Sequence, residues 1–254
     1  MANKIYYTKS AMYGDVVLKQ HSTGYAAAAE AKALREYGNC HKFCKLYEYD
    51  TENHTLLLER MIPGTPLKHE AASEKRLDVF LSLYKDLHKK PENPSKFPTY
   101  VQWVQNASAY LQGKPDHKNI YEYMLKASDI CSELVARYPV QFLLHGDFHF
   151  DNILLDKGGD YKIIDPKGVL GHPLFDLPRY LLNEYWLMCR TTNDAAEHLK
   201  IMSHIINYFA STLSIPQDDI RKSYYVEAAM ANSWLIEDGR QPMMDDIYFA
   251  LRLL

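Results

Sequence analysis

The 254-residue sequence contains no apolar run long enough to span a bilayer. Its first residues, MANKIYYTKS, lack the apolar core and small-residue cleavage site of a secretory signal. We therefore expect a cytoplasmic protein with no membrane partner. Charge of one sign is also lacking, because 29 Lys and Arg oppose 32 Asp and Glu, for a formal net charge of -3. This balance argues against a general polyanion binder, so no nucleic-acid partner is expected.

Cysteine is scarce and irregularly placed, at positions 40, 44, 131 and 189. This argues against a disulfide framework and predicts reduced thiols. Cys40, His41 and Cys44 form a short cluster that suggests a zinc site, but no second pair follows at a finger-like spacing. We favour packing residues of a helix-to-strand connection there.

The apolar content of 47% is ample for a core, and the chain is long enough for one large domain or two lobes. Two β-prone runs, Ile5–Thr8 and Val16–Lys19, flank a turn and predict a hairpin. Helix formers from Gly24 to Tyr37, followed by a Gly-Asn stop, predict a helix. Phe43–Tyr49 and Thr55–Glu59 read as further strands. The chain therefore begins with a small sheet and one helix.

Beyond Pro66 the apolar spacing becomes mainly helical. Short strand-like runs interrupt it at 142–144, 153–155 and 161–164, separated by polar, glycine-bearing segments typical of an active site. We predict an α+β fold of two lobes hinged at Pro63-Gly64. Residues 1–63 form the β-rich N-terminal lobe in this prediction, and residues 64–254 form the larger, mainly helical C-terminal lobe.

An ordered set of polar residues carries the chemistry. His145-Gly146-Asp147 leads to Asn152, and Asp165 follows at the end of the next predicted hairpin. Phosphoryl transfer needs a carboxylate that accepts the proton of the attacking hydroxyl, and oxygen ligands for a magnesium ion between the phosphates. The order H-x-D-x-x-x-x-N followed by Asp is that of kinase catalytic loops. We predict Asp147 as the catalytic base, and Asn152 and Asp165 as ligands of Mg2+.

A metallohydrolase is a competing interpretation, because His145 and His149 alternate with Asp147 and Asp151. The other histidines form no group at a recognisable spacing, so we give this interpretation little weight. His145 is instead predicted to be a structural, hydrogen-bonding residue that shapes the loop.

The motif HGDFHFDNIL, followed by IIDPKGVLGHPLFDLPRYL, resembles the aminoglycoside phosphotransferase family, closest to its streptomycin and hydroxyurea resistance kinases. In that branch DPKG stands where protein kinases carry DFG. The resemblance extends from LLLERMIPGTPL to NSWLIEDGR and covers most of the chain. It implies a protein-kinase-like fold, ATP and Mg2+ as cofactors, and transfer of phosphate to a hydroxyl of a small molecule.

The resemblance also implies residues that bind the nucleotide. Lys19 ends a strand, as the phosphate-binding lysine of kinases does. We prefer Glu30 to Glu36 as its partner, because the sequence around Glu30 resembles the family's glutamate helix. The carbonyl of Arg60 and the amide of Ile62 are predicted to bind the adenine edge at the hinge. An edge strand followed by a turn is the alternative for that segment.

On the substrate side, Glu237 and Asp238 resemble the acidic segment of these kinases and suit a cationic amine or guanidinium. A solvated helix end, stopped by Gly239, explains the same residues equally well. Asp176 occupies the position of an aspartate that supports the catalytic loop in the family. Helix capping ahead of Pro178 explains it too.

One departure concerns the loop between the first two strands, which has Gly14 and no further glycine. The glycine-rich phosphate loop of protein kinases is therefore missing, and a reduced nucleotide lid is expected. The sequence thus predicts a small-molecule kinase, with an aminoglycoside such as streptomycin as the acceptor. A housekeeping kinase of another small alcohol or amino sugar stays open, as does a catalytically silent nucleotide-binding protein. The sequence predicts no oligomeric state.

Overall fold

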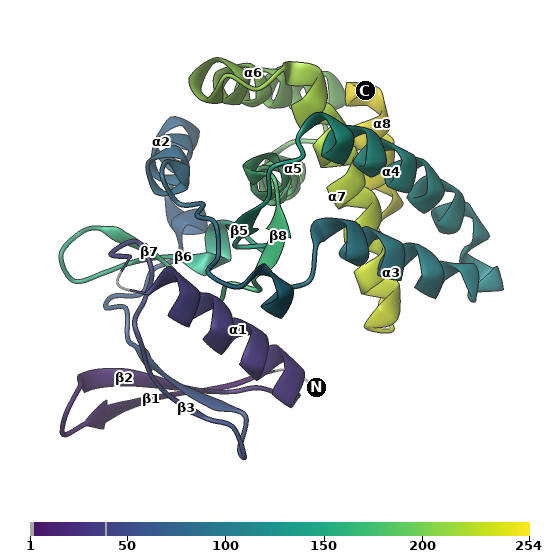
Figure 1. The fold of residues 1–254 in the computed structure, drawn as a ribbon. Coiled ribbons are helices and arrows are strands. Elements are labelled where there is room, and N and C mark those ends of the chain that lie inside the picture. The colour runs from purple at the N-terminus through teal and green to yellow at the C-terminus, as the bar shows by residue number, and fades with distance from the viewer. Residues whose placement is uncertain (1–2, 39) are drawn as a thin grey trace. The chain divides into compact units, whose positions relative to one another are not determined.

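The computed structural model describes residues 3–38 and 40–254 (Figure 1). The chain divides into two compact units, Met1–Phe97 with Phe142–Val169 and Pro98–Gln141 with Leu170–Leu254. Within the described residues, no helix is both long and apolar enough to cross a bilayer. The predicted combination of a small N-terminal sheet and a larger helical part is confirmed.

The compact units do not follow the predicted boundary after residue 63. Residues 64–97 and 142–169 belong with the N-terminal sheet. A backbone hydrogen bond from Gly64 N to Leu155 O (3.0 Å) and one from Leu155 N to Thr65 O (3.0 Å) attach the segment after the sheet to the catalytic hairpin. Lobes of 1–63 and 64–254 therefore stay a prediction, distinct from the compact units.

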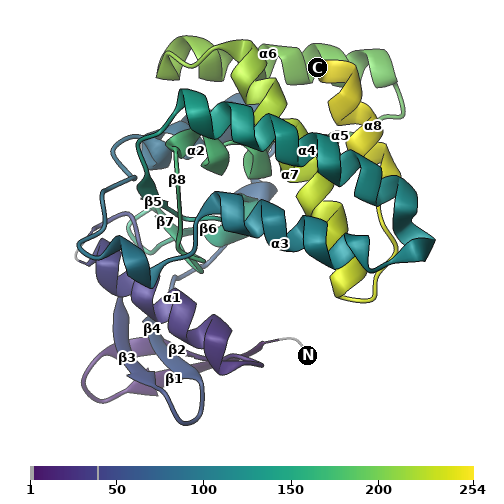
Figure 2. The same ribbon diagram turned by 45° about the vertical axis from the view of Figure 1, so that its right-hand side comes forward.

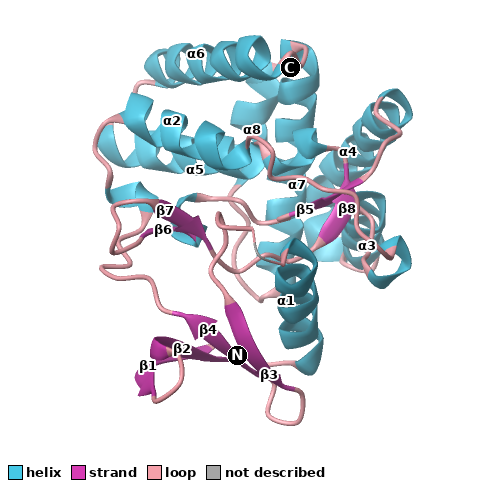
Figure 3. Ribbon diagram, turned by 60° about the vertical axis from the view of Figure 1, so that its left-hand side comes forward, coloured by secondary structure: helices cyan, strands magenta, loops and turns pink. Residues whose placement is uncertain are grey.

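The first unit contains a four-stranded antiparallel sheet in the order β1-β2-β4-β3, coloured magenta in Figure 3. Its strands are β1 (Lys4–Ser10), β2 (Gly14–Gln20), β3 (Leu46–Asp50) and β4 (Thr55–Glu59). The predicted first hairpin is correct. β3 begins three residues later than expected, because Phe43 makes an isolated parallel bridge to Ile163 instead of joining the sheet.

Helix α1 (Gly24–Tyr37) lies against this sheet (Figure 1). Thr23 caps its N-terminus by accepting a hydrogen bond from Ala26 N (3.3 Å), and Gly38, with φ of 62°, ends it. Small residues such as Ala27 and Ala31 are fully buried, which lets the helix approach closely. The predicted helix is confirmed with the same bounds.

The rest of the first unit supplies a short hairpin and the helix near it. β6 and β7 pair antiparallel, as the sequence predicted, around the turn at Gly158-Gly159. These further elements are α2 (Ser73–Tyr84), β5 (Phe142–Leu144), β6 (Ile153–Leu155), β7 (Tyr161–Ile163), and the 3-10 helices η1 (Leu67–His69), η2 (Pro94–Lys96) and η4 (Phe150–Asn152).

The second unit is mainly helical and is built around α7 (Figure 2). Helix α7 contacts α3, α4, α5, α6 and α8, and every residue from Ser223 to Ser233 is buried. A helix buried on all sides is the centre of a core. The elements are α3 (Tyr100–Gln112), η3 (Pro115–His117), α4 (Lys118–Arg137), β8 (Val169–Gly171), η5 (Pro173–Asp176), α5 (Pro178–Thr191), α6 (Ala195–Leu213), α7 (Gln217–Glu237) and α8 (Met244–Leu253).

A buried acid, Asp246 of α8, lies in this helical core. Its Oδ1 accepts a hydrogen bond from Trp186 Nε1 (3.0 Å), while its Oδ2 has no partner among the described residues. Burial raises the pKa of Asp246 to about 6, outweighing the Trp186 hydrogen bond, and the charge of Asp245 adds to the rise. The charged form of Asp246 therefore destabilises the fold.

We expect Asp246→Asn to change how stability depends on pH. A carboxyl with a raised folded pKa contributes stability that is present below its unfolded value and lost as pH rises through about 6. Between pH 4 and pH 8, the unfolding free energy of wild type should fall relative to that of the variant by roughly 2 kcal/mol. Urea unfolding at both pH values measures this shift. The exposed Asp129→Asn is the matched control, and parallel pH curves for Asp246→Asn and wild type would contradict the prediction.

Candidate active site

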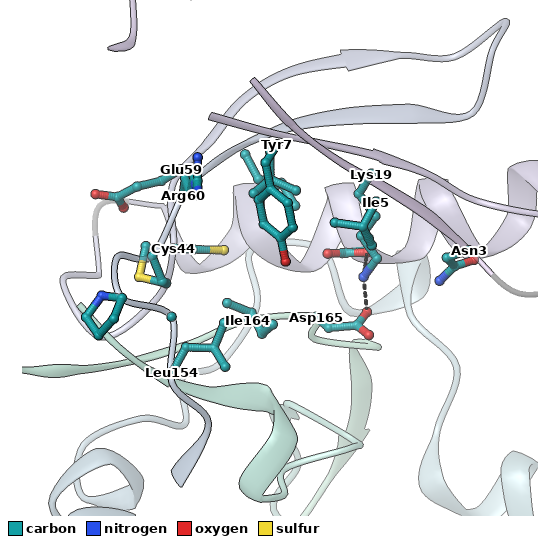
Figure 4. A pocket seen from close by; sticks show the side chains of 16 residues that line it. Asn3, Ile5, Tyr7, Lys19, Cys44, Glu59, Arg60, Leu154, Ile164 and Asp165 are labelled. Atoms are coloured by element: carbon teal, nitrogen blue, oxygen red, sulfur yellow. Dashed lines mark ion pairs between the residues drawn. The ribbon is translucent and has the colours of Figure 1, made fainter. Parts of the chain in front are cut away.

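One face of the N-terminal sheet forms a wall of a pocket of about 580 Å3. Strand register pairs Ile5 with Lys19 and Tyr7 with Val17, and Val17 in turn with Leu58. Directly paired residues point to the same side of a sheet, and side chains alternate along each strand. All five side chains therefore line the pocket together, and Figure 4 shows Ile5, Tyr7 and Lys19 along it.

The opposite wall comes from the hairpin that follows the catalytic loop. Leu154 of β6 and Ile164 after β7 face the sheet across the pocket (Figure 4). The pocket is thus an apolar slot with an ionic end, since Lys19 and Asp165 lie on one side of it. A slot of this size and polarity suits a flat ring joined to an anionic group.

The predicted hinge lies at the other end of the pocket. Arg60 is among the lining residues, and its guanidinium lies over the Tyr7 ring, 4.7 Å from the centroid. Ile62 is 37% exposed and is not among the described residues that line the pocket. Cys44 lines it as a neutral thiol, because burial raises its pKa. The roles of Arg60 and Ile62 stay predictions.

Lys19 is the centre of a buried ionic cluster. Its Nζ lies 2.7 Å from Glu30 Oε2 and 2.7 Å from Asp165 Oδ1, and its side chain is 8% exposed. Burial lowers the pKa of Lys19, but the charges of Glu30 and Asp165 outweigh it, so the net pKa is raised. His21 Nε2 also lies 2.7 Å from Glu30 Oε2.

The structure places Glu30, and not Glu36, beside Lys19. Glu36 Oε1 instead accepts a hydrogen bond from the backbone of Glu92 (2.8 Å). Both glutamates lie on α1, but Glu30 is buried and Glu36 points to a different neighbour. Glu36 follows Glu30 by six residues, a rotation of about 240° around the helix axis, so the two side chains point in different directions.

Asp165 receives two ammonium groups on one oxygen. Lys19 Nζ lies 2.7 Å and Lys167 Nζ 2.8 Å from Asp165 Oδ1. Burial raises the pKa of Asp165, but the charges of Lys167 and Lys19 outweigh it and bring the pKa to about 2. Its backbone φ of 59° is left-handed, which few residues other than glycine adopt. The low pKa means that the carboxylate is ionised at neutral pH.

The catalytic loop is shaped by His145, which is fully buried. Its Nε2 lies 2.9 Å from Ile164 O, and its Nδ1 accepts from Asp147 N at 3.1 Å. Because Nδ1 accepts, Nε2 must carry the proton and donate to Ile164. One imidazole thus connects the loop that carries Asp147 to the strand end that carries Asp165.

His149, Lys167 and Asn152 lie near the Asp147 carboxylate. His149 Nε2 lies 3.4 Å from Oδ1, Lys167 Nζ lies 3.7 Å from Oδ2, and Asn152 Nδ2 lies 3.4 Å from Oδ2. His149 Nδ1 accepts from Asp151 N (3.2 Å), and Asn152 Nδ2 lies 3.2 Å from His149 Nε2. The structure therefore brings the predicted residues Asp147 and Asn152 together.

The donor set fits a small divalent cation. Asn152 Nδ2 donates to Asp147 O (2.9 Å), which leaves the amide oxygen as the atom that a cation can use. Asp165 adds a carboxylate, and such cations are bound by one or two carboxylates together with phosphate oxygens. Among the described residues no group of three His, Cys, Asp or Glu could hold a metal.

Lys167, His149 and His21 also contact these residues, although the motif spacing gave none of them a role in a kinase site. The sequence carries one signal for Lys167, its place two residues after Asp165 in DPKG. His149 lies two residues after Asp147, in the loop already singled out. His21 follows Lys19 on the same side of the chain but lies beyond β2, so alternation alone does not assign it.

The remaining predicted residues belong to the second unit. Glu237 ends α7, and Asp238 is its C-terminal cap residue. Asp176 is buried in η5, and the N-cap position of α5 is Leu177 rather than Asp176. The substrate contacts predicted for Glu237 and Asp238, and the support of the catalytic loop predicted for Asp176, stay predictions.

Comparisons with known proteins define first the fold. The choline/ethanolamine kinase family protein of Mesorhizobium loti aligns with a TM-score of 0.71 at 14% identity, over 100% of this chain and 85% of that one. An amicoumacin kinase, hAmiN, in complex with AMP-PNP, Ca2+ and Ami, aligns with a TM-score of 0.59 at 13% identity, over 99% and 84%. The protein-kinase-like fold is therefore confirmed.

The sequence then defines the family. Residues 16–239 match the aminoglycoside/hydroxyurea antibiotic resistance kinase family, and the chain belongs to it. Streptomycin 6-kinase of Streptomyces griseus is 26% identical over 204 residues, which cover 77% of this chain. The match spans 62% of that relative's own length.

We expect Lys19→Met to destabilise the first unit by about 3 kcal/mol, because it leaves Glu30, with a side chain 2% exposed, without its ammonium partner. Adding Glu30→Gln should recover part of that loss, since the two residues are coupled. Urea unfolding of the single and double variants measures both effects. Lys157→Met, an exposed lysine of the same unit, is the control; additive losses would show that the ion pair does not form in solution.

Proposed function

We propose that this protein is an ATP-dependent phosphotransferase that phosphorylates a hydroxyl of a small cationic molecule, an aminoglycoside such as streptomycin or a related compound. The observation that carries the proposal is the ionic set of Lys19, Asp165, Lys167 and Asp147, of which Lys19 and Asp165 line an apolar slot. Family membership and the similarity to streptomycin 6-kinase support it. The proposal includes no nucleic-acid or membrane partner and a cytoplasmic location.

In this proposal ATP occupies the pocket of the first unit. Its adenine lies in the apolar slot near Tyr7 and Leu154, where the backbone of Arg60 and Ile62 binds the base edge. Its phosphates contact the ammonium group of Lys19, which the ion pair with Glu30 holds in position. The pocket volume of about 580 Å3 is within the range of cofactor sites.

Mg2+ is the proposed metal, held by Asn152 and Asp165. When bound, it neutralises charge between the phosphates. The side chains of this chain position these two ligands: Asp147 O accepts from the Asn152 amide, and Lys19 and Lys167 hold the Asp165 carboxylate. His145 then couples the two parts of the ligand set through Ile164 O and Asp147 N.

Asp147 is the proposed base. Its carboxylate orients the acceptor hydroxyl and accepts the hydroxyl proton as the oxygen attacks the γ phosphorus. His149 and Asn152 restrict the directions that the carboxylate can take, because they face different oxygens. Positioning of this kind is the main contribution that a protein makes to phosphoryl transfer.

Asp147→Asn should lower kcat by about 10²- to 10⁴-fold, because the amide cannot accept the proton. Nucleotide affinity should change little, since Asp147 is not among the described residues that line the nucleotide pocket. ATP consumption with magnesium, over streptomycin, other aminoglycosides and small amino alcohols, measures turnover. Nucleotide titration measures binding.

The acceptor panel also separates the alternatives. Turnover with an amino alcohol or amino sugar but not with aminoglycosides would identify a housekeeping kinase. Nucleotide binding with no turnover on any acceptor, and an Asp147→Asn variant that behaves like wild type in cells, would identify a silent binding protein.

Glu237 and Asp238 are the proposed contacts of the cationic substrate. Replacing them with Gln and Asn removes two negative charges and should raise KM for the aminoglycoside about tenfold while KM for ATP stays within about twofold. Steady-state kinetics with each substrate varied in turn measures the two constants. Asp129→Asn, which removes an exposed charge from the same unit, is the matched control. An unchanged acceptor KM would favour the solvated helix end.

A further inference from the structure

Lys167 connects the two carboxylates of the candidate active site. Its Nζ lies 2.8 Å from Asp165 Oδ1 and 3.7 Å from Asp147 Oδ2. Asp165 is the proposed metal ligand and Asp147 the proposed base, so the transferred phosphoryl group must pass between them. An ammonium group that contacts both carboxylates is therefore close to the path of that group.

The backbone of Lys167 is firmly held. Lys167 N donates to His145 O at 2.7 Å, and Gly168 N lies 3.3 Å from the same oxygen. Gly168 has a φ of 69°, and a Cβ there would meet Ala33 at 3.0 Å and Phe97 at 3.2 Å. The starting point of the Lys167 side chain is thus fixed against the catalytic loop.

The ammonium end differs from that of Lys19 in its freedom to move. The Lys19 side chain is 8% exposed and is also paired with the buried Glu30, whereas the Lys167 side chain is 38% exposed. Lysine carries a compact charge on a flexible stem. The ammonium group of Lys19 is therefore held in one place, whereas the ammonium group of Lys167 can move to contact a phosphate.

Electrostatic attraction favours movement of the Lys167 ammonium group toward the γ phosphate. A γ phosphate that approaches Asp147 and Asp165 meets two carboxylates of its own sign, and like charges at such distances repel. Lys19 is already shared between Glu30 and Asp165. Lys167 is the second ammonium on Asp165, and it is also the one that extends to Asp147.

We propose that Lys167 is a catalytic residue whose ammonium moves from the carboxylate pair onto the γ-phosphoryl group and stabilises it during transfer. This inference rests on the proposed function. In the step, the acceptor oxygen bonds to the γ phosphorus, the bond from that phosphorus to the bridging oxygen breaks, and its electron pair leaves with ADP. The acceptor proton passes to Asp147, and Lys167 keeps its own protons. Such charge stabilisation is a large part of catalysis by kinases.

Lys167→Met, which keeps the length of the side chain and removes its charge, tests the proposal. We expect kcat to fall about 10²-fold or more, with KM for the acceptor within about threefold of wild type. Lys167→Arg should recover part of kcat. Lys157→Met, an exposed lysine between β6 and β7, is the matched control and should behave like wild type. A kcat for Lys167→Met within about threefold of wild type overturns the proposal.

A binding measurement separates a phosphate contact from a merely structural ion pair. Calorimetric titration with AMP-PNP and with ADP, each with magnesium, gives the ratio of the two affinities. Loss of a γ-phosphate contact should weaken AMP-PNP by about tenfold and ADP by less than about twofold. Equal weakening of both nucleotides, together with a lower unfolding midpoint, would show a structural role and overturn the proposal.

The same titration distinguishes failure of this inference from failure of the proposed function. If wild type binds nucleotide but phosphorylates no acceptor, the proposed function fails, and the selective loss of AMP-PNP binding still decides where Lys167 acts. If wild type turns over while Lys167→Met keeps both its kcat and its affinity ratio, the inference alone fails. Wild type that binds neither nucleotide overturns both.

Discussion

The Asp165 carboxylate is the point on which the site depends. Two lysines reach its Oδ1, Lys19 from the sheet and Lys167 from the chain just beyond β7. Glu30 joins the cluster from α1 through Lys19. One partly buried carboxylate thus ties a strand, a helix and a loop to a common position. Since removing one member of a buried ionic cluster leaves an uncompensated charge, these elements are held in register by electrostatics as well as by packing.

This arrangement explains why the catalytic hairpin belongs to the same compact unit as the N-terminal sheet. Apolar side chains of both, such as Val17 and Leu154, line one slot, and the ionic cluster closes one end. The slot offers burial to an apolar ring, and the cluster offers charge to an anion. His145 adds a connection between the segments that carry Asp147 and Asp165, because its two ring nitrogens bond to the backbone of both segments.

In the second unit, the central helix serves mainly for packing. Helix α7 is buried along its middle, so its side chains there serve packing, while Glu237 and Asp238 at its end remain available to a ligand. A shared fold carries many acceptors, as the choline/ethanolamine and amicoumacin kinases among its structural neighbours illustrate. In the proposed function, residues of the first unit carry out phosphoryl transfer, and residues of the helical unit select the acceptor.

The sequence by itself determined the elements and the order of the chemical groups. Two β-prone runs around a turn predicted the first hairpin, helix formers predicted α1, and the spacing of Asp147, Asn152 and Asp165 predicted a kinase site, because these are local patterns. A local match favoured Glu30 over Glu36, and the structure places Glu30 beside Lys19. The tertiary structure alone decided that Lys167 extends to both carboxylates, and that residues 64–97 and 142–169 pack with the sheet. These facts depend on pairings between distant segments, for which a single sequence carries no local signal.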